Sequence, residues 1–144
     1  MKYISTRGNS EEIDFKDATL RGLANDGGLY IPKKWPFLNF NDCIDKPYEE
    51  IAYNVISLFT GNTISKINLK KIINKSYTNF NIKNVVSLKN LYSNQWVLEL
   101  HHGPTLAFKD IALQLLGNIF DFFLKESTKT TTVIGATSGD TGAA

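Results

Sequence analysis

Apolar residues in the first half of the chain recur with the period of an α-helix. Three such stripes predict three amphipathic helices, because positions three and four apart share one helix face. Asp14 caps the first helix, Pro47 opens the second, which ends at Gly61, and Asn68 caps the third. The core stripes are Phe15, Ala18, Thr19, Gly22 and Leu23; Ile51, Val55, Leu58 and Phe59; and Leu69, Ile72, Ile73, Ser76, Tyr77 and Phe80.

Shorter apolar runs predict strands. Leu29–Ile31 forms a short strand that Pro32 ends. In the second half the period changes, and Val85–Leu88 and Trp96–Leu100 are typical of strands, with Ser93–Gln95 as the turn before the second.

A strongly apolar helix is expected from Asp110, followed by a buried strand over Thr131–Ala136. A strand, a helix and a strand in this order form a parallel unit, which makes the fold class α/β. We therefore predict a largely helical region over residues 1–80 and the beginning of an α/β domain over 81–144. The stripe of the helix is Ile111, Ala112, Leu115, Leu116, Ile119, Phe120 and Phe123.

Composition narrows the function classes. The 144 residues are 42% hydrophobic, which suits a globular core, and 16 basic against 14 acidic residues are too balanced to favour nucleic acid or an anionic membrane. Cys43 is the only cysteine, so no intramolecular disulfide, cysteine zinc site or iron–sulfur ligand set can form. No leader or membrane-spanning stretch is evident, and we predict a cytoplasmic protein.

Lys109 closes the run His102–Asp110, where it follows the apolar Leu106–Phe108 and opens a helix. Desolvation and the positive end of the helix dipole both favour loss of its proton. A neutral lysine amine is a nucleophile, used in Schiff bases with carbonyl substrates or pyridoxal phosphate. Taken alone the signal is weak, because most lysines are solvated surface charges.

Thr137–Gly142 follows the expected strand as a turn rich in glycine and hydroxyl groups. Its glycines, Gly139 and Gly142, let successive N–H groups and side-chain hydroxyls converge on a carboxylate or phosphate. The alternative is a plain tight turn between a strand and a helix.

Other polar residues have competing explanations. His101 and His102 are neighbours on an expected strand and would point to opposite faces, so we predict no metal site. Glu99 and Asp110 are a possible carboxylate pair, although Asp110 is better explained as a helix-start residue. Arg7 either binds an anion through its two guanidinium nitrogens or is a surface arginine.

The two motifs and two earlier blocks closely resemble the threonine synthase family of pyridoxal-phosphate enzymes. The blocks are Tyr3–Gly8 and Gly22–Pro32, so the resemblance extends from end to end. It implies a tryptophan synthase β-like fold of PLP fold type II, with a helical amino-terminal region leading into an open, twisted, mostly parallel sheet. Threonine synthases are several hundred residues long, so the chain is expected to be a truncated amino-terminal third.

The resemblance also implies a reaction, in which O-phospho-L-homoserine and water give L-threonine and phosphate. Lys109 would hold pyridoxal 5'-phosphate as a Schiff base and then act as an acid and base. The remaining cofactor contacts implied are His102, Ser138, Gly139, Asp140, Thr141 and Gly142, and the substrate contacts are Thr137, Ser138, Thr141 and Arg7.

Two positions qualify these assignments. Asp140 stands where related enzymes of this fold have an asparagine that donates to the cofactor's phenolic oxygen. An ionised carboxylate cannot donate, so Asp140 would need a proton, or would orient the turn or meet a cationic amine. His101 stands where the family usually has an aromatic residue, and His102 is either a cofactor contact or a structural histidine.

Three alternatives stay open on the sequence. A threonine-synthase-like phospho-lyase would eliminate phosphate without making threonine. A truncated chain would be a non-catalytic module, and a simple anion-binding domain would leave Lys109 exposed. We expect the 144 residues alone to be inert and not to hold the cofactor specifically, because no site for the cofactor's phosphate is identified in them.

Overall fold

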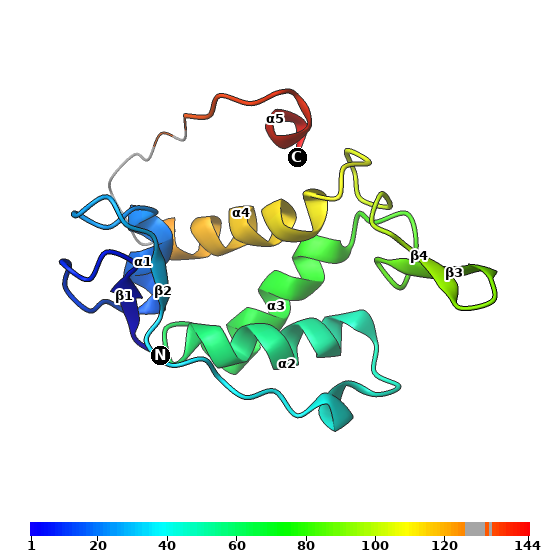
Figure 1. Cartoon of the computed structure of the whole chain (residues 1–144), viewed down its shortest axis with the longest axis horizontal. Coiled ribbons are helices and arrows are strands. Elements are labelled where there is room, and N and C mark those ends of the chain that lie inside the picture. Colours follow the sequence, from blue (N-terminus) through cyan, green and yellow to red (C-terminus); the bar gives the residue numbers. More distant parts are fainter. Residues whose placement is uncertain (126–131, 133) are drawn as a thin grey trace. The chain divides into compact units, whose positions relative to one another are not determined.

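A computed structural model describes residues 1–125, 132 and 134–144 (Figure 1). The chain forms two compact units, Met1–Lys71 and Ile72–Ala144. This division falls inside a helix, whereas the boundary near Phe80 marks a change of sequence pattern, and the two-domain assignment stays a prediction.

The first unit begins with a small antiparallel sheet. β1 (Tyr3–Ser5) pairs with β2 (Tyr30–Pro32), so that Tyr3 faces Pro32 and Ser5 faces Tyr30. β2 confirms the predicted short strand, shifted by one residue. Tyr3 and Ser5 are buried on the same face because alternate residues of a strand share a face.

Two helices of the first unit confirm their predicted starts and one confirms its predicted end, whereas α1 (Phe15–Arg21) ends before Gly22 and Leu23, which its predicted core stripe included and which are exposed. In α1 the carboxylate of Asp14 accepts the N–H of Asp17 at 2.9 Å, as a helix cap does. α2 (Tyr48–Thr60) starts after Pro47 and ends at Gly61, whose φ of 56° favours glycine. The α2 stripe is half-buried, and the short 3-10 helix η1 (Phe40–Cys43) precedes it.

α3 (Lys66–Tyr77) begins earlier than its predicted cap. Ser65 Oγ accepts the N–H of Asn68 at 3.3 Å, so Ser65 is the cap and the prediction of Asn68 was wrong. Serine and asparagine are both good caps, so propensity alone could not choose between them. The predicted core stripe is confirmed, since Leu69, Ile72, Ile73, Ser76, Tyr77 and Phe80 are all buried.

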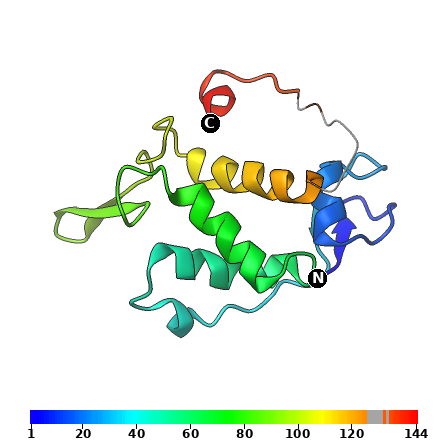
Figure 2. The same cartoon turned by 180° about the vertical axis from the view of Figure 1, so that it is seen from behind.

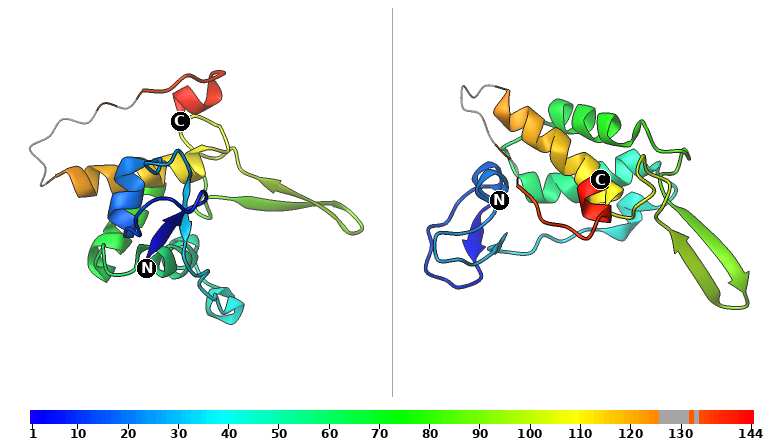
Figure 3. Two further views of the ribbon diagram at one scale, coloured as in Figure 1. Left: turned by 60° about the vertical axis from the view of Figure 1, so that its left-hand side comes forward. Right: turned by 90° about the horizontal axis from the view of Figure 1, so that it is seen from above.

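The second unit contains a hairpin of β3 (Ser87–Tyr92) and β4 (Gln95–Glu99), which projects away from α4 in both views of Figure 3. The second strand and the turn broadly match their predictions. The first was placed too early: Val85 is buried with a φ of 62°, which no strand residue adopts. Most hairpin side chains are exposed.

α4 (Asp110–Leu124) confirms the long apolar helix. Leu115, Ile119 and Phe123 are buried. Tyr77 Oη donates to the carbonyl of Ile111 at 3.0 Å, and the amide of Asn118 donates to the hydroxyl of Ser76 at 3.1 Å, so the end of α3 lies against α4. Figure 2 shows the two helices from behind.

The expected parallel unit is not formed by the described residues. Thr131 and Val133 lie outside them, while Thr132 and Ile134–Ala136 belong to no strand, and Ile134 is 91% exposed. The sheets of the described ranges are both antiparallel. A strand buried on both faces needs hydrogen-bonded neighbours, and the described residues supply none here.

Candidate active site around Lys109

The start of α4 is fixed by a buried carboxylate beside Lys109. Asp110 is fully buried, and its two oxygens accept the N–H of Thr105 at 2.9 Å and the Thr105 hydroxyl at 2.7 Å. Gly103 is required opposite, because a Cβ there would lie 2.4 Å from Asp110. Asp110 therefore holds the loop on the helix, as the helix-start interpretation proposed.

Lys109 reaches the turn near the end of the chain. Its Nζ lies 2.5 Å from Asp140 Oδ2 and 5.1 Å from the centre of the Phe108 ring. The lysine side chain is 28% exposed. The sequence separation of the two residues is large, so the chain fold creates this ion pair.

The expectation that the apolar run Leu106–Phe108 marks a desolvated place for Lys109 was wrong. Leu106 is 63% and Phe108 58% exposed. The reason is local: the run folds as a turn, with Leu106 at a φ of 63°, and not as a segment facing a core. Lys109 is shielded by the ion pair with Asp140 and by one face of Phe108.

The turn from Thr137 onwards leads into α5 (Asp140–Ala143), and Gly139 has a φ of 131°. Asp140 Oδ1 accepts the N–H of Thr141 at 3.0 Å and lies 3.5 Å from the hydroxyl of Ser138. Thr137 Oγ1 accepts the N–H of Gly139 at 3.2 Å. Of the groups predicted to receive an anion, the Ser138 hydroxyl and the Thr141 N–H thus lie against the Asp140 carboxylate.

Asp140 is held in its ionised form. The hydrogen bond from Lys109 lowers the pKa of its carboxyl below the ordinary value, and the coulombic effect of Lys109 acts in the same direction. Asp140 therefore contacts the Lys109 amine, as one of the three roles left open by the sequence requires, and its part in the reaction stays a prediction. An ionised Asp140 accepts hydrogen bonds and cannot donate them.

His102 belongs to a second polar cluster. Its Nε2 lies 3.1 Å from Glu99 Oε2, and Lys89 Nζ lies 2.7 Å from Glu99 Oε1. The hydrogen bond from Lys89 is the main reason that the pKa of Glu99 is lowered. Sequence reasoning missed the Glu99–His102 contact, because residues three apart on a strand point to opposite faces, and the predicted strand was extended past Glu99, where β4 ends.

The argument that separated His101 from His102 was wrong. β4 ends at Glu99, so strand alternation no longer applies at the two histidines. Their ring centres lie only 4.6 Å apart, at 35°. The two side chains therefore lie on the same side of the chain.

Arg7 lies in the first unit, and its recorded contact is also there. Its Nη1 donates to the carbonyl of Asp26 at 3.1 Å. The carboxylate of Asp26 accepts the Ser5 hydroxyl at 2.7 Å and the N–H of Asn9 at 2.9 Å. Arg7 thus joins the two blocks near the start of the chain, and its role in binding substrate stays a prediction.

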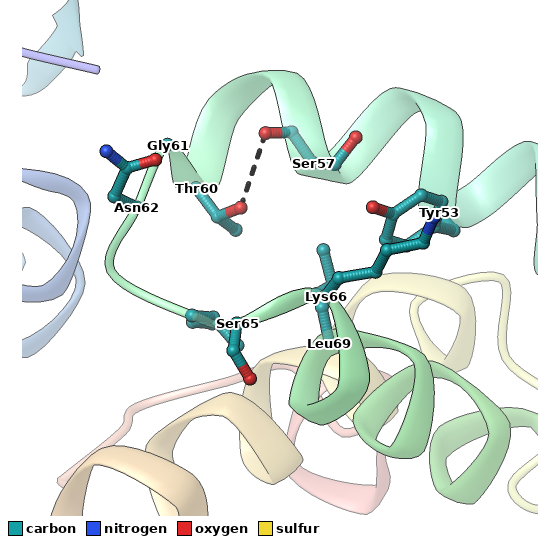
Figure 4. Close-up of a pocket in the computed structure, with 9 residues that line it drawn as sticks. Tyr53, Ser57, Thr60, Gly61, Asn62, Ser65, Lys66 and Leu69 are labelled. Atoms are coloured by element: carbon teal, nitrogen blue, oxygen red, sulfur yellow. Dashed lines mark hydrogen bonds between the residues drawn. The ribbon is translucent and has the colours of Figure 1, made fainter.

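A pocket of the first unit contains none of the predicted site residues. Its volume is ≈ 370 Å³, and it lies at the α2–α3 junction (Figure 4). Figure 4 shows the hydroxyl of Thr60 bonded to the carbonyl of Ser57. The lining residues are Tyr53, Ser57, Thr60, Gly61, Asn62, Ile64, Ser65, Lys66 and Leu69.

Comparison with known proteins shows which family this chain resembles. The family model described as the threonine synthase N terminus matches residues 2–77, more than half of the chain. Threonine synthase of Pseudomonas aeruginosa is 46% identical over 147 aligned residues, which cover 100% of this chain and 31% of that protein. Threonine synthase of Schizosaccharomyces pombe is 47% identical, with 100% and 30% covered.

Solved structures give the same result. The crystal structure of PLP-bound threonine synthase from Brucella melitensis matches 99% of this chain and 31% of its own, with a TM-score of 0.94 and 43% identity. The yeast threonine synthase structure matches 88% of this chain and 27% of its own, with a TM-score of 0.82 and 38% identity. These matches confirm the predicted fold family.

The chain spans about a third of the length of the relatives that it matches. The similarity nevertheless includes the run that ends at Lys109 and the turn that contains Asp140, because it covers the whole of this chain. On the family model, the relatives and the solved structures together, the chain belongs to the threonine synthase family.

Proposed function

We propose that this chain is the amino-terminal part of a threonine synthase, which converts O-phospho-L-homoserine and water to L-threonine and phosphate. The observation that carries the proposal is the 2.5 Å contact between Lys109 Nζ and Asp140. It brings the lysine of the first motif onto the turn of the second. The chain's similarity to threonine synthases along its whole length supports the same reaction.

The donor set fits pyridoxal 5'-phosphate. Lys109 supplies a partly exposed primary amine, which is the group that binds this cofactor's aldehyde. The Ser138 hydroxyl and the Thr141 N–H lie against the amine's partner, Asp140. When bound, the cofactor supplies an electron sink for carbanion chemistry. Lys109, His102 and Ser138–Gly142 would hold it.

Lys109 and Asp140 would handle protons. In this structure Asp140 Oδ2 accepts a hydrogen bond from Lys109 Nζ. The same carboxylate can orient the amine when it takes or returns a proton beside the substrate. Because Asp140 is ionised, we infer that it acts as an acceptor and does not replace the asparagine donor of related enzymes.

Substrate binding would use the turn and Arg7. The hydroxyls of Thr137, Ser138 and Thr141, with the N–H groups of a glycine-containing turn, suit a carboxylate. Arg7 suits the substrate phosphate, because a guanidinium group binds phosphate through two parallel hydrogen bonds.

A chimaeric enzyme tests the function. Residues 1–144 would replace the corresponding segment of the Pseudomonas aeruginosa relative, and threonine and phosphate would be measured from O-phospho-L-homoserine. We expect both products in equal amounts. Lys109→Ala should lower threonine formation by about three orders of magnitude or more. Lys125→Ala, at the other end of α4, is the matched control and should keep the activity.

Two results would contradict this assignment. Threonine formed at an undiminished rate by the folded Lys109→Ala chimaera would remove the lysine from the reaction. Phosphate released without threonine would favour a phospho-lyase, a reading that the 36% identity to the mouse protein named threonine synthase-like 2 keeps as the second candidate. Circular dichroism of each variant would establish that it is folded.

Two further parts of the proposal concern the protein's surroundings. Among the helices of the described ranges, none has the length and apolar character needed to cross a membrane. We propose a cytoplasmic enzyme whose partner is its small-molecule substrate. The balanced charge of the chain supports the prediction that it does not bind nucleic acid.

A further inference from the structure

We propose that Glu99, His101 and His102 form a binding site for a divalent first-row transition metal ion, with Zn²⁺ as the ion that suits it best. One ligand atom from each residue lies within 4.8 Å of the others. The inference does not rest on the proposed function, although His102 is shared with the cofactor contacts proposed above.

The distances between the ligand atoms suit zinc. Zinc binds histidine nitrogen and carboxylate oxygen at about 2.0–2.2 Å, so two ligands of a tetrahedral site lie about 3.3 Å apart. His102 Nε2 and Glu99 Oε2 are 3.1 Å apart without an ion. Two imidazoles and one carboxylate are also a ligand set that zinc uses, with a fourth position left for water.

The three proposed ligands differ in burial: Glu99 and His102 are largely buried, whereas His101 is exposed to solvent. The side chain of Glu99 is 13% and that of His102 17% exposed, so both are held by their surroundings. The carbonyl of His102 accepts the N–H of Asn81 at 2.8 Å, which fixes the backbone. His101 is exposed, and its ring can turn by the small distance needed to reach an ion.

The positive charge of Lys89 disfavours binding of a metal ion at Glu99. Its Nζ lies 2.7 Å from Glu99 Oε1, where it takes one carboxylate oxygen and places a positive charge beside the site. The lysine side chain is 62% exposed, so it can swing into water when an ion binds Glu99. Removal of the Lys89 charge should therefore strengthen metal binding. If the Glu99–Lys89 pair were purely structural, its removal would not have this effect.

The composition makes the site traceable. The chain contains two histidines, both in this cluster, and one cysteine, Cys43, which lies in the first unit. Binding that depends on histidine must therefore arise at His101 and His102.

The test is titration of the 144-residue chain with Zn²⁺ by calorimetry and with Co²⁺ by visible absorption. We expect one ion per chain, a tetrahedral Co²⁺ spectrum and a rise in unfolding temperature with Zn²⁺. His101→Ala and Glu99→Gln should each weaken Zn²⁺ binding by about tenfold or more, since each removes a ligand. Lys89→Met should strengthen it, and Cys43→Ser should leave it unchanged.

Several outcomes would overturn the site. These are no stoichiometric Zn²⁺ binding, binding that persists in folded His101→Ala, binding that Lys89→Met weakens, and equal affinity for Mg²⁺, which would indicate unspecific carboxylate attraction. His101 is exposed, so its substitution is not expected to unfold the chain, and His101→Gln provides a second, polar replacement.

Discussion

Asp26 and Asp140 are both aspartates beside glycines, yet their partners differ. Asp26 accepts hydrogen bonds from neutral groups, the Ser5 hydroxyl and the N–H groups of Asn9 and Gly28, at 2.7, 2.9 and 2.9 Å. Asp140 faces a cationic amine. The pKa of each is lowered, by the Ser5 hydroxyl first in one case and by Lys109 first in the other.

From this difference we infer that Asp26 has a structural role and that Asp140 takes part in the reaction. The bonds of Asp26 join two segments of the first unit, and Gly28 fits there because a Cβ would lie 2.2 Å from Ser5 Oγ. The Lys109–Asp140 pair is partly exposed, at 28% and 45%, and such pairs add little to stability. We therefore infer that the Lys109–Asp140 pair contributes to the reaction and not to stability.

Of the two aspartates, Asp140 should show the larger effect on activity, which Asp140→Asn in the chimaeric enzyme tests. The variant keeps the shape of the side chain but removes the negative charge that orients Lys109 Nζ. Threonine formation should fall by about 10²–10⁴-fold, the usual contribution of a positioned proton-transfer group. The unfolding temperature of the 144-residue chain should hardly change. If the variant were strongly destabilised but kept its activity, Asp140 would have a structural role like that of Asp26.

Asp26→Asn should give the reverse result, a smaller effect confined to stability. The amide cannot accept all the bonds that the carboxylate takes from Ser5, Asn9 and Gly28, so the unfolding temperature should fall by several degrees. Activity per folded chimaera should stay within about twofold of the parent, as for surface substitutions distant from the chemistry. A large loss of activity in a fully folded Asp26→Asn chimaera would contradict the structural role assigned to Asp26.

The lowered pKa of Asp26 makes the stability of the folded chain depend on pH in acid. A carboxyl whose pKa is lower in the folded state stabilises the fold above the unfolded value, and the stabilisation is lost as pH falls through the folded value. For Asp26 the ordinary value is 3.8 and the folded one is lower, so the loss should begin near pH 4 and continue below it. Asp26→Asn should flatten this part of the stability profile.

Local signals in the sequence predicted most helix ends. Asp14, Pro47 and Gly61 act through their own backbone and nearest neighbours, so α1 and α2 begin, and α2 ends, where those residues indicate. The apolar stripe of α3 was equally readable, because its period is a property of the helix itself. In α4 the same pattern was confirmed only in part, since Ala112 and Leu116 of its predicted stripe are exposed.

Long-range contacts were the part that the sequence could not supply. Whether Leu106 and Phe108 are covered depends on distant segments, and both are exposed here. The choice of partner by Arg7, the Asp26 carbonyl, depends on how two blocks meet. The motifs identified Lys109 and Asp140 separately, but only the fold shows that they form a pair.

The most direct test of the account is to trap the cofactor. The chimaera would be incubated with pyridoxal phosphate, reduced with borohydride, digested and mapped by mass spectrometry, with the isolated 144-residue chain treated in parallel. We expect stoichiometric labelling of Lys109 in the chimaera, and weak labelling spread over many lysines in the isolated chain. Stoichiometric labelling of another lysine, with Lys109 unmodified, would contradict it.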